Sequence, residues 1–347
     1  MAELDILKPL ISKVAHGLDG KIITIYGGNN LGKTYQAVRA ERPLVLCVES
    51  GLNAIGGVSH FVIDTWSTFV KIVKQLTGKK SAQAKEMYKT IVIDEVYALS
   101  MLCQRYVCDN EGDGCLDIST YEKREDEKKT KNLYKIYENV YWAQINLLAK
   151  AGYTVLFIGH AQANTKTGFI SLKGDKRCVQ PVIDNSDIVA YLQPNGVDEN
   201  GKEILSSAYF VETQDFFARS RYPEMVEKID VFTIENLEKA IEDAIQEGCE
   251  KKGIESVSFE EKQASEKVDH LSFEELVKRL NTIISLVAEQ KGEESDELFK
   301  LGEIMESTLG VGKKISTATK RDIQNLELLL YDFEEALEEM GISIPEV

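Results

Sequence analysis

The chain has 347 residues, of which 43% are hydrophobic and 8% aromatic, and this apolar content excludes wholesale disorder. Its 57 acidic residues outnumber its 41 basic ones, and the net charge of −16 argues against nonspecific nucleic-acid binding by the chain as a whole. No apolar run approaches the roughly 20 residues of a membrane helix, and the six cysteines are too sparse for a disulfide scaffold. We therefore expect a folded cytoplasmic protein with no membrane partner.

Short apolar runs alternate with helical stretches over the first 230 or so residues, which is typical of an α/β fold with a mostly parallel sheet. The runs expected to form the central strands are Ile22–Tyr26, Leu44–Val48, Ile91–Ile93 and Tyr153–Ile158. Two later runs, Asp187–Leu192 and Ile204–Val211, flank the turn-rich segment Pro194–Gly201 and predict a C-terminal antiparallel hairpin.

The pattern then changes to helices, which we expect at Ile234–Gly248, Phe273–Lys291, Glu294–Leu309 and Thr317–Met340. From Ile254 onward there are 22 acidic and 10 basic residues, a net charge of −12, which leaves −4 for the rest of the chain. The sequence thus predicts a core at residues 1–249, a polar linker at 250–270 and a small acidic all-α domain at 271–347.

The strongest motif lies between the first strand and the helical stretch Tyr35–Ala40, and it fits the pattern G-x-x-x-x-G-K-[ST]: Gly27, Gly28, Asn29, Asn30, Leu31, Gly32, Lys33 and Thr34. Glycines in such a loop let backbone N–H groups surround phosphate oxygens. The lysine supplies a positive charge to the β and γ phosphates, and the Thr34 hydroxyl can ligate Mg²⁺. The motif, with Tyr35 directly after it, predicts a site for ATP and Mg²⁺.

Carboxylates follow two of the predicted strands, at the sheet edge where ligands bind in α/β folds. Asp94 comes directly after Ile91–Ile93, and we expect it to hold Mg²⁺ together with Thr34. Glu95 is one candidate for the general base that activates water, and Glu49, which follows Leu44–Val48, is the other. The residues alone leave this choice open.

The strand at Tyr153–Ile158 is followed by polar residues and then by a basic segment. Gln162 would lie at the sheet edge, where it can sense a γ-phosphate; the alternative is the start of a solvated loop. The segment Asn164–Arg177 reads as a flexible loop that can bind a nucleic-acid backbone, through Lys166, Phe169, Lys173, Lys176 and Arg177. The mixed-charge run Glu122–Lys131 is either an exposed face or a second nucleic-acid contact.

Two arginines, Arg219 and Arg221, lie beyond the predicted hairpin. They can either form local ion pairs or reach the γ-phosphate of a neighbouring subunit and stabilise charge in the transition state. The second possibility requires a homo-oligomer with composite sites.

Together these motifs resemble the RecA-like P-loop ATPases of bacteriophages, the Sak-type single-strand annealing group. The segments that carry the resemblance lie between Gly20 and Asp230 and comprise the phosphate loop, Val48–Leu52, Ile93–Asp94, Phe157–Gln162, Asp187–Val189 and Ala218–Arg221. The resemblance implies a RecA-like core, Glu49 as base, and Gln162 as the link between nucleotide and a DNA-binding loop. It also implies that Arg219 and Arg221 act across a subunit interface.

We therefore expect an ATP-dependent phage recombinase that anneals or exchanges single-stranded DNA, in the host cytoplasm. The acidic tail is then a self-packed bundle, a competitor of DNA for the basic loop, or a docking site for a partner such as a single-strand DNA-binding protein. The alternatives are a replication-accessory or helicase-loading ATPase that acts through protein partners, and a P-loop regulator without a nucleic-acid role.

Overall fold

The computed structural model describes residues 6–49, 51–121, 131–267 and 270–342. The chain divides into two compact units, one spanning Leu10–Glu266 and the other spanning Lys267–Val347 with the first nine residues. All but the last residue of the mixed-charge run Glu122–Lys131 lies outside the described residues. No helix in the described part of the chain has both the length and the apolar character needed to cross a membrane.

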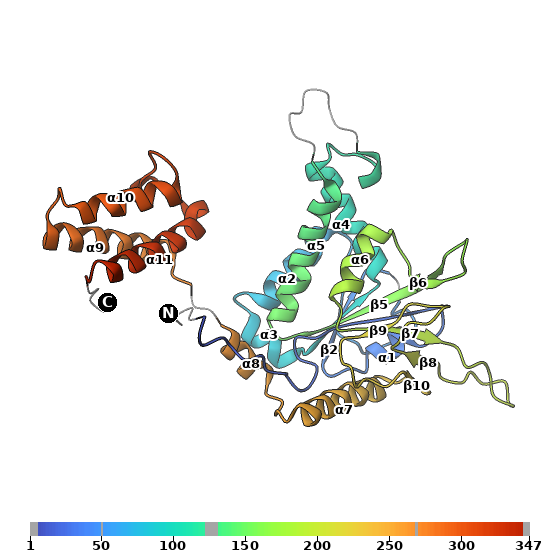
Figure 1. Ribbon diagram of the computed structural model, residues 1–347. Coiled ribbons are helices and arrows are strands. Elements are labelled where there is room, and N and C mark those ends of the chain that lie inside the picture. Colours follow the sequence, from blue (N-terminus) through green and yellow to red (C-terminus); the bar gives the residue numbers. More distant parts are fainter. Residues whose placement is uncertain (1–5, 50, 122–130, 268–269, 343–347) are drawn as a thin grey trace. The chain divides into compact units, whose positions relative to one another are not determined.

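A mostly parallel sheet forms the centre of the larger unit (Figure 1). The order along the sheet is β10-β8-β7-β1-β5-β4-β2-β3, while β6 pairs with β5 and β9 with β7. All neighbours from β7 to β3 are parallel, and β6, β8, β9 and β10 pair antiparallel. The strands are β1 (Ile22–Gly27), β2 (Pro43–Cys47), β3 (His60–Val62), β4 (Thr90–Asp94), β5 (Thr154–Ala163), β6 (Ile170–Leu172), β7 (Ile188–Gln193), β8 (Ser207–Tyr209), β9 (Arg219–Ser220) and β10 (Lys228–Ile229).

Helices cover both faces of this sheet, as the continuous apolar strands require. In β1, Ile22 and Tyr26 pack into the core beneath α2, α4, α5 and α6, whereas Ile23 and Ile25 pack into the core beneath α1 and α7. The helical segments of this unit are α1 (Lys33–Ala37), α2 (Trp66–Thr77), α3 (Ser81–Met87), α4 (Val96–Glu111), η1 (Ile118–Thr120), α5 (Leu133–Lys150), α6 (Lys176–Asn185), α7 (Ile234–Lys252) and α8 (Phe259–Glu266). The α/β fold expected from the sequence is confirmed.

The segment Asn164–Arg177 is not the single flexible loop that its composition suggests. β5 continues to Ala163 and pairs with β6, with Gln162 opposite Ser171. The turn between them is closed by Asn164, whose Oδ1 accepts the backbone N–H groups of Lys166 at 2.9 Å and Thr167 at 3.2 Å. The segment is therefore a β-hairpin that leads into the first residues of α6.

The boundary between the units falls at Glu266 and Lys267, inside the expected linker at 250–270, but most of that segment packs on the larger unit. The N–H of Val257 donates to the carbonyl of Val14 at 2.9 Å, so this part of the chain pairs with the N-terminal segment of the core. The Phe259 ring packs closely against two glycines: a Cβ at Gly20 would lie 2.1 Å from it and a Cβ at Gly152 2.9 Å. These long-range contacts, which composition cannot reveal, hold α8 on the larger unit.

The smaller unit is helical and has its own apolar core, which includes Leu280, Ile283, Leu326 and Phe333. Its segments are α9 (Phe273–Lys291), α10 (Asp296–Leu309), η2 (Ile315–Thr317), η3 (Lys320–Asp322) and α11 (Ile323–Glu339). The last helix begins later than its periodicity suggests, because two short 3-10 turns precede it.

The position of Phe259 predicts a measurable loss of stability. We expect Phe259→Ala to lower the free energy of unfolding of the larger unit by about 2 kcal/mol, because a half-buried ring is removed from between two glycines. Glu260→Ala, at the exposed next position, is the control and should change it by less than about 0.5 kcal/mol. Denaturant unfolding of both variants measures the difference, and equal stabilities would show that α8 is not held by this ring.

Candidate active site

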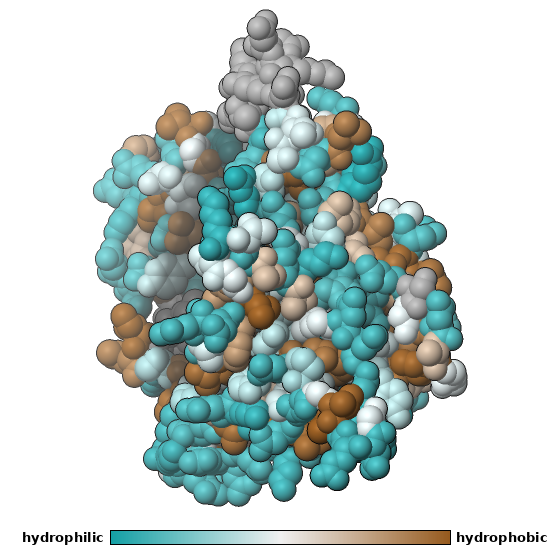
Figure 2. Space-filling model, turned by 90° about the vertical axis from the view of Figure 1, so that its right-hand side faces the viewer, coloured by the Kyte–Doolittle hydropathy of each residue, from teal (hydrophilic) through white to brown (hydrophobic). Residues whose placement is uncertain are grey.

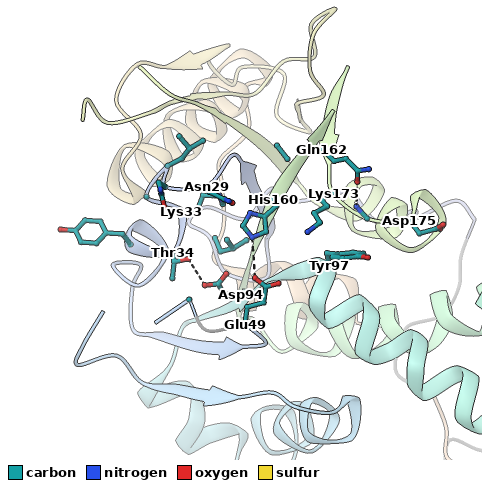
Figure 3. Close-up of a pocket in the computed structure, with 18 residues that line it drawn as sticks. Asn29, Lys33, Thr34, Glu49, Asp94, Tyr97, His160, Gln162, Lys173 and Asp175 are labelled. Carbon is teal, nitrogen blue, oxygen red and sulfur yellow. Dashed lines mark hydrogen bonds and ion pairs between the residues drawn. The ribbon is translucent and has the colours of Figure 1, made fainter. Parts of the chain in front are cut away.

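A cleft of about 1110 Å³ opens at the carboxyl ends of the parallel strands (Figure 3). Seven of its lining residues are consecutive, Asn29–Tyr35. The others follow β2, end β4, lie in β5 from Ile158 onward, begin α4 or connect β6 to α6. The sheet order explains this convergence, because β5 lies between β1 and β4 and all three strands end at the same edge. The cleft is large enough for a nucleotide.

The loop between β1 and α1 is tightly curled. Asn30 has φ 60° and Gly32 has φ 75°, so both adopt the left-handed conformation that asparagine and glycine tolerate best. At Gly27, where the loop begins, a Cβ would lie only 2.8 Å from the carbonyl oxygen of Leu192 on β7. Alternation of left- and right-handed residues is the backbone form that surrounds anions with N–H groups.

Lys33 lies inside this curl, with only 7% of its surface exposed. Its Nζ donates hydrogen bonds to the carbonyl oxygens of Gly27, at 3.2 Å, and of Gly28. Burial lowers the pKa of Lys33 to about 8, while the nearby Asp94 and Glu95 carboxylates oppose that change. The ammonium is thus held by the loop at the position where phosphate oxygens would replace the carbonyls.

Thr34 and Asp94 bring together oxygen donors from α1 and β4. The Thr34 hydroxyl donates to Asp94 Oδ2 at 2.8 Å. Burial raises the pKa of Asp94, and this hydrogen bond and the Lys33 charge act in the opposite direction. A Cβ at Gly51 would lie 2.6 Å from the same oxygen, so only glycine leaves the space in front of Asp94 open. A hydroxyl and a carboxylate beside an open space are donors that fit Mg²⁺.

The two glutamates weighed as general base have different environments. Glu49 is exposed in the cleft, with its Oε2 3.8 Å from Nε2 of His160 on β5. Glu95 is 1% exposed and does not line the cleft. Its two carboxylate oxygens accept the N–H groups of Tyr97 at 3.1 Å and Ala98 at 3.0 Å, so it caps the N-terminus of α4. Glu49 is the one of the two that can meet a water molecule in the cleft.

The far side of the cleft is formed by residues of β5 and the segment after β6. Gln162 lines it and accepts the N–H of Gly174 at 3.4 Å. Lys173 also lines it, with its ammonium 5.1 Å from the centre of the Tyr97 ring (Figure 3). Sequence reasoning did not identify Gly51, Tyr97 or Asp175 as lining residues, and no local pattern signals them, since they reach the cleft only through the fold.

The residues suggested for nucleic acid occupy three separate places. Lys166 is exposed in the turn between β5 and β6, and Phe169 is half-buried beside it. Lys176 and Arg177 are exposed at the start of α6, where the Arg177 guanidinium lies 4.4 Å from the Tyr134 ring centre. Lys173 lies in the cleft instead. The face toward which β5 and β6 extend is mostly hydrophilic, with apolar residues in small separate patches (Figure 2).

Arg219 and Arg221 lie outside the cleft and bind the C-terminal end of α6. Arg219 donates to the carbonyls of Asp184 at 3.1 Å and Ser186 at 3.2 Å, and Arg221 donates to Asp184 at 2.8 Å. Arg221 also lies 3.5 Å from the Asp187 carboxylate. Cations at a helix C-terminus satisfy its free carbonyls and oppose its dipole, so both arginines hold the end of α6 beside β9 in the same chain.

Comparison with known proteins agrees with this geometry. Residues 19–222 match the AAA domain family, so the chain belongs to this family of P-loop ATPases. The SPbeta prophage-derived uncharacterized protein YorG of Bacillus subtilis is 43% identical over 336 residues, which is 97% of this chain and 99% of that protein. The similarity therefore extends through both units of the chain.

The space in front of Asp94 predicts the effect of a single methyl group. We expect Gly51→Ala to weaken the Mg²⁺-dependent part of ATP binding by about tenfold or more, because its Cβ would collide with Asp94 Oδ2. Gly56→Ala is the matched control, since a Cβ there meets no atom within 4 Å. Calorimetric titration of ATP with and without Mg²⁺ measures the effect, and equal affinities for the two variants would contradict the proposed metal position.

The lowered pKa of Lys33 predicts proton uptake on nucleotide binding. Only the protonated ammonium attracts phosphate, and in the free protein it loses its proton above pH 8. ATP affinity should therefore fall by up to about tenfold per pH unit from pH 8 upward, and binding at pH 8.5 should take up a proton. Calorimetry in buffers of different ionisation enthalpy measures the uptake. An affinity that is constant from pH 7 to 9.5, with no proton exchange, would be inconsistent with this role.

Proposed function

We propose that this chain is a phage-encoded Mg²⁺-dependent ATPase that binds single-stranded DNA and promotes its annealing or strand exchange. The observation that carries this proposal is the continuity of β5, which lines the nucleotide cleft with His160 and Gln162 and then forms the hairpin with β6. A nucleotide and a nucleic acid bound at these two places would be coupled through one strand. The 43% sequence identity to a prophage-derived protein supports the proposal that the chain is encoded by a phage.

In the proposed reaction, Lys33 and the curled loop hold the β and γ phosphates. Thr34 and Asp94 would hold Mg²⁺, which neutralises phosphate charge when it is bound. Glu49 accepts a proton from the attacking water, and its exposure in the cleft keeps it accessible to that water. Glu95 is assigned a structural role, because capping α4 uses both of its oxygens.

Gln162 is the proposed link between hydrolysis and DNA. It lies opposite Ser171 in the hairpin and accepts a hydrogen bond from Gly174, so a change at the γ-phosphate that moves Gln162 also changes the hairpin. Lys166, Lys176 and Arg177 supply exposed positive charge for the DNA backbone, and Phe169 supplies a ring for base stacking. This arrangement is the one that a Sak-type, RecA-like ATPase would need.

The remaining parts are assigned by their contacts. Arg219 and Arg221 would have to leave the carbonyls of α6 to reach a neighbouring subunit, so we assign them to bracing α6 rather than to catalysis in trans. The chain is proposed to act as a homo-oligomer on DNA. The acidic helical unit is proposed to dock a partner, such as a single-strand DNA-binding protein.

Removing cations from the hairpin and from α6 should weaken DNA binding in a salt-dependent way. We expect Lys166→Ala and Lys176→Ala each to lower the slope of log affinity against log salt by about 0.7 for single strands. Lys202→Ala, in the exposed connection between β7 and β8, is the control and should leave the slope unchanged. Fluorescence anisotropy with a labelled oligonucleotide measures the slope. Identical slopes in all three variants would show that DNA does not bind to this surface.

A second measurement separates the proposed function from its alternatives. Single-stranded DNA should stimulate ATP hydrolysis, and the protein should speed the annealing of complementary oligonucleotides. Copurification with a helicase, without annealing activity, would instead indicate a helicase-loading ATPase. Hydrolysis that no nucleic acid affects would indicate a P-loop regulator.

A further inference from the structure

We propose that Lys173 is a catalytic residue, whose ammonium binds the γ-phosphate and neutralises the charge that develops there as ATP is cleaved. This inference rests on the proposed ATPase function and adds a residue to it. It also moves Lys173 from the predicted nucleic-acid surface into the reaction.

The backbone fixes Lys173 beside the nucleotide. Its N–H donates to the carbonyl of His160 at 2.9 Å, and the N–H of the next residue, Gly174, donates to Gln162. Both of these partners belong to the part of β5 that lines the cleft. The Lys173 side chain extends into the cleft between His160 and Tyr97 (Figure 3). The backbone of Lys173 is thus fixed by the strand that lines the cleft.

No carboxylate among the described residues forms an ion pair with Lys173, although the Glu95 carboxylate interacts with its charge at longer range. The Lys173 ammonium lies against the Tyr97 ring. A cation–π contact of a partly exposed lysine is worth about 0.5–1 kcal/mol, whereas a hydrogen bond between charged groups is worth about 1.5–3 kcal/mol. A phosphate oxygen within reach would therefore draw the ammonium away from the ring. The contact with the Tyr97 ring is the position of the ammonium in the nucleotide-free protein.

The composition of the cleft points to the same residue. Among the described residues that line the cleft, two have a positively charged side chain, Lys33 and Lys173. Lys33 is held by the loop that we propose binds the β-phosphate, and Arg219 and Arg221 are bound to α6. Phosphoryl transfer is accelerated most by cations placed at the γ-phosphate oxygens. Within the described lining of the cleft, Lys173 is the cation besides Lys33 that can reach the γ-phosphate oxygens.

The chemical step is a displacement by water at the γ-phosphorus. The water oxygen forms a bond to the γ-phosphorus while the bond from that phosphorus to the β–γ bridging oxygen breaks. The electron pair stays on the bridging oxygen of ADP, and the proton of the water goes to Glu49. Lys173 remains protonated and donates hydrogen bonds to a γ-phosphate oxygen throughout. The products are ADP, inorganic phosphate and a proton.

The test compares Lys173→Met and Lys173→Arg with wild type, with Lys239→Met on the exposed face of α7 as the control. Binding of ADP and of the non-hydrolysable analogue AMP-PNP is measured without DNA, together with kcat. We expect Lys173→Met to bind AMP-PNP about tenfold more weakly, to bind ADP within about twofold of wild type, and to lose about 100-fold in kcat. Lys173→Arg should recover part of both losses, and Lys239→Met should match wild type.

Retained ADP binding shows that the variant is folded. Equal weakening of AMP-PNP and ADP, or an unchanged kcat, would overturn the assignment. A reduced salt slope of DNA binding in Lys173→Met, with normal hydrolysis, would show that Lys173 contacts DNA. That result would also overturn the catalytic assignment. Failure of the wild-type protein to bind AMP-PNP would overturn the proposed function itself, which is a different result.

Discussion

The hydrogen bond between Thr34 and Asp94 joins two segments that are 60 residues apart in the chain, and the rest of the site depends on it. It forms because β5 lies between β1 and β4, so that the phosphate loop and the acidic strand end face each other across one strand. The glycine at position 51 keeps the space beside this pair free. The order of the strands, the curl of the loop and the glycine at position 51 together place the Thr34 hydroxyl and the Asp94 carboxylate side by side.

The strand between β1 and β4, β5, connects the cleft to the hairpin with β6. β5 contributes His160 and Gln162 to the cleft and continues beyond it as one arm of a hairpin. Lys173 returns from the other arm to the same cleft. If the proposed function is correct, this segment would respond to the presence of a γ-phosphate, and its turn, with Lys166, would contact the nucleic acid.

The sequence predicts those features that are local. The phosphate loop is a contiguous motif, and each central strand is a short apolar run, so both could be located from the residues alone. The choice between Glu49 and Glu95 could not, because it depends on which carboxylate caps α4. Lys173 and Arg219 were assigned by charge and spacing, yet their contacts come from Tyr97 and from the end of α6. The packing of α8 within the expected linker could not be predicted for the same reason, since it depends on glycines that are distant in the sequence.

The central claim is that a nucleoside triphosphate is held by the curled loop through the buried ammonium of Lys33. The most direct measurement is a calorimetric titration of the full-length protein and of its Lys33→Ala variant with ATP in the presence of Mg²⁺. Wild type should bind one nucleotide per chain, and the variant should lose most of that affinity while it keeps its fold by circular dichroism. Equal binding by the two proteins would contradict the account.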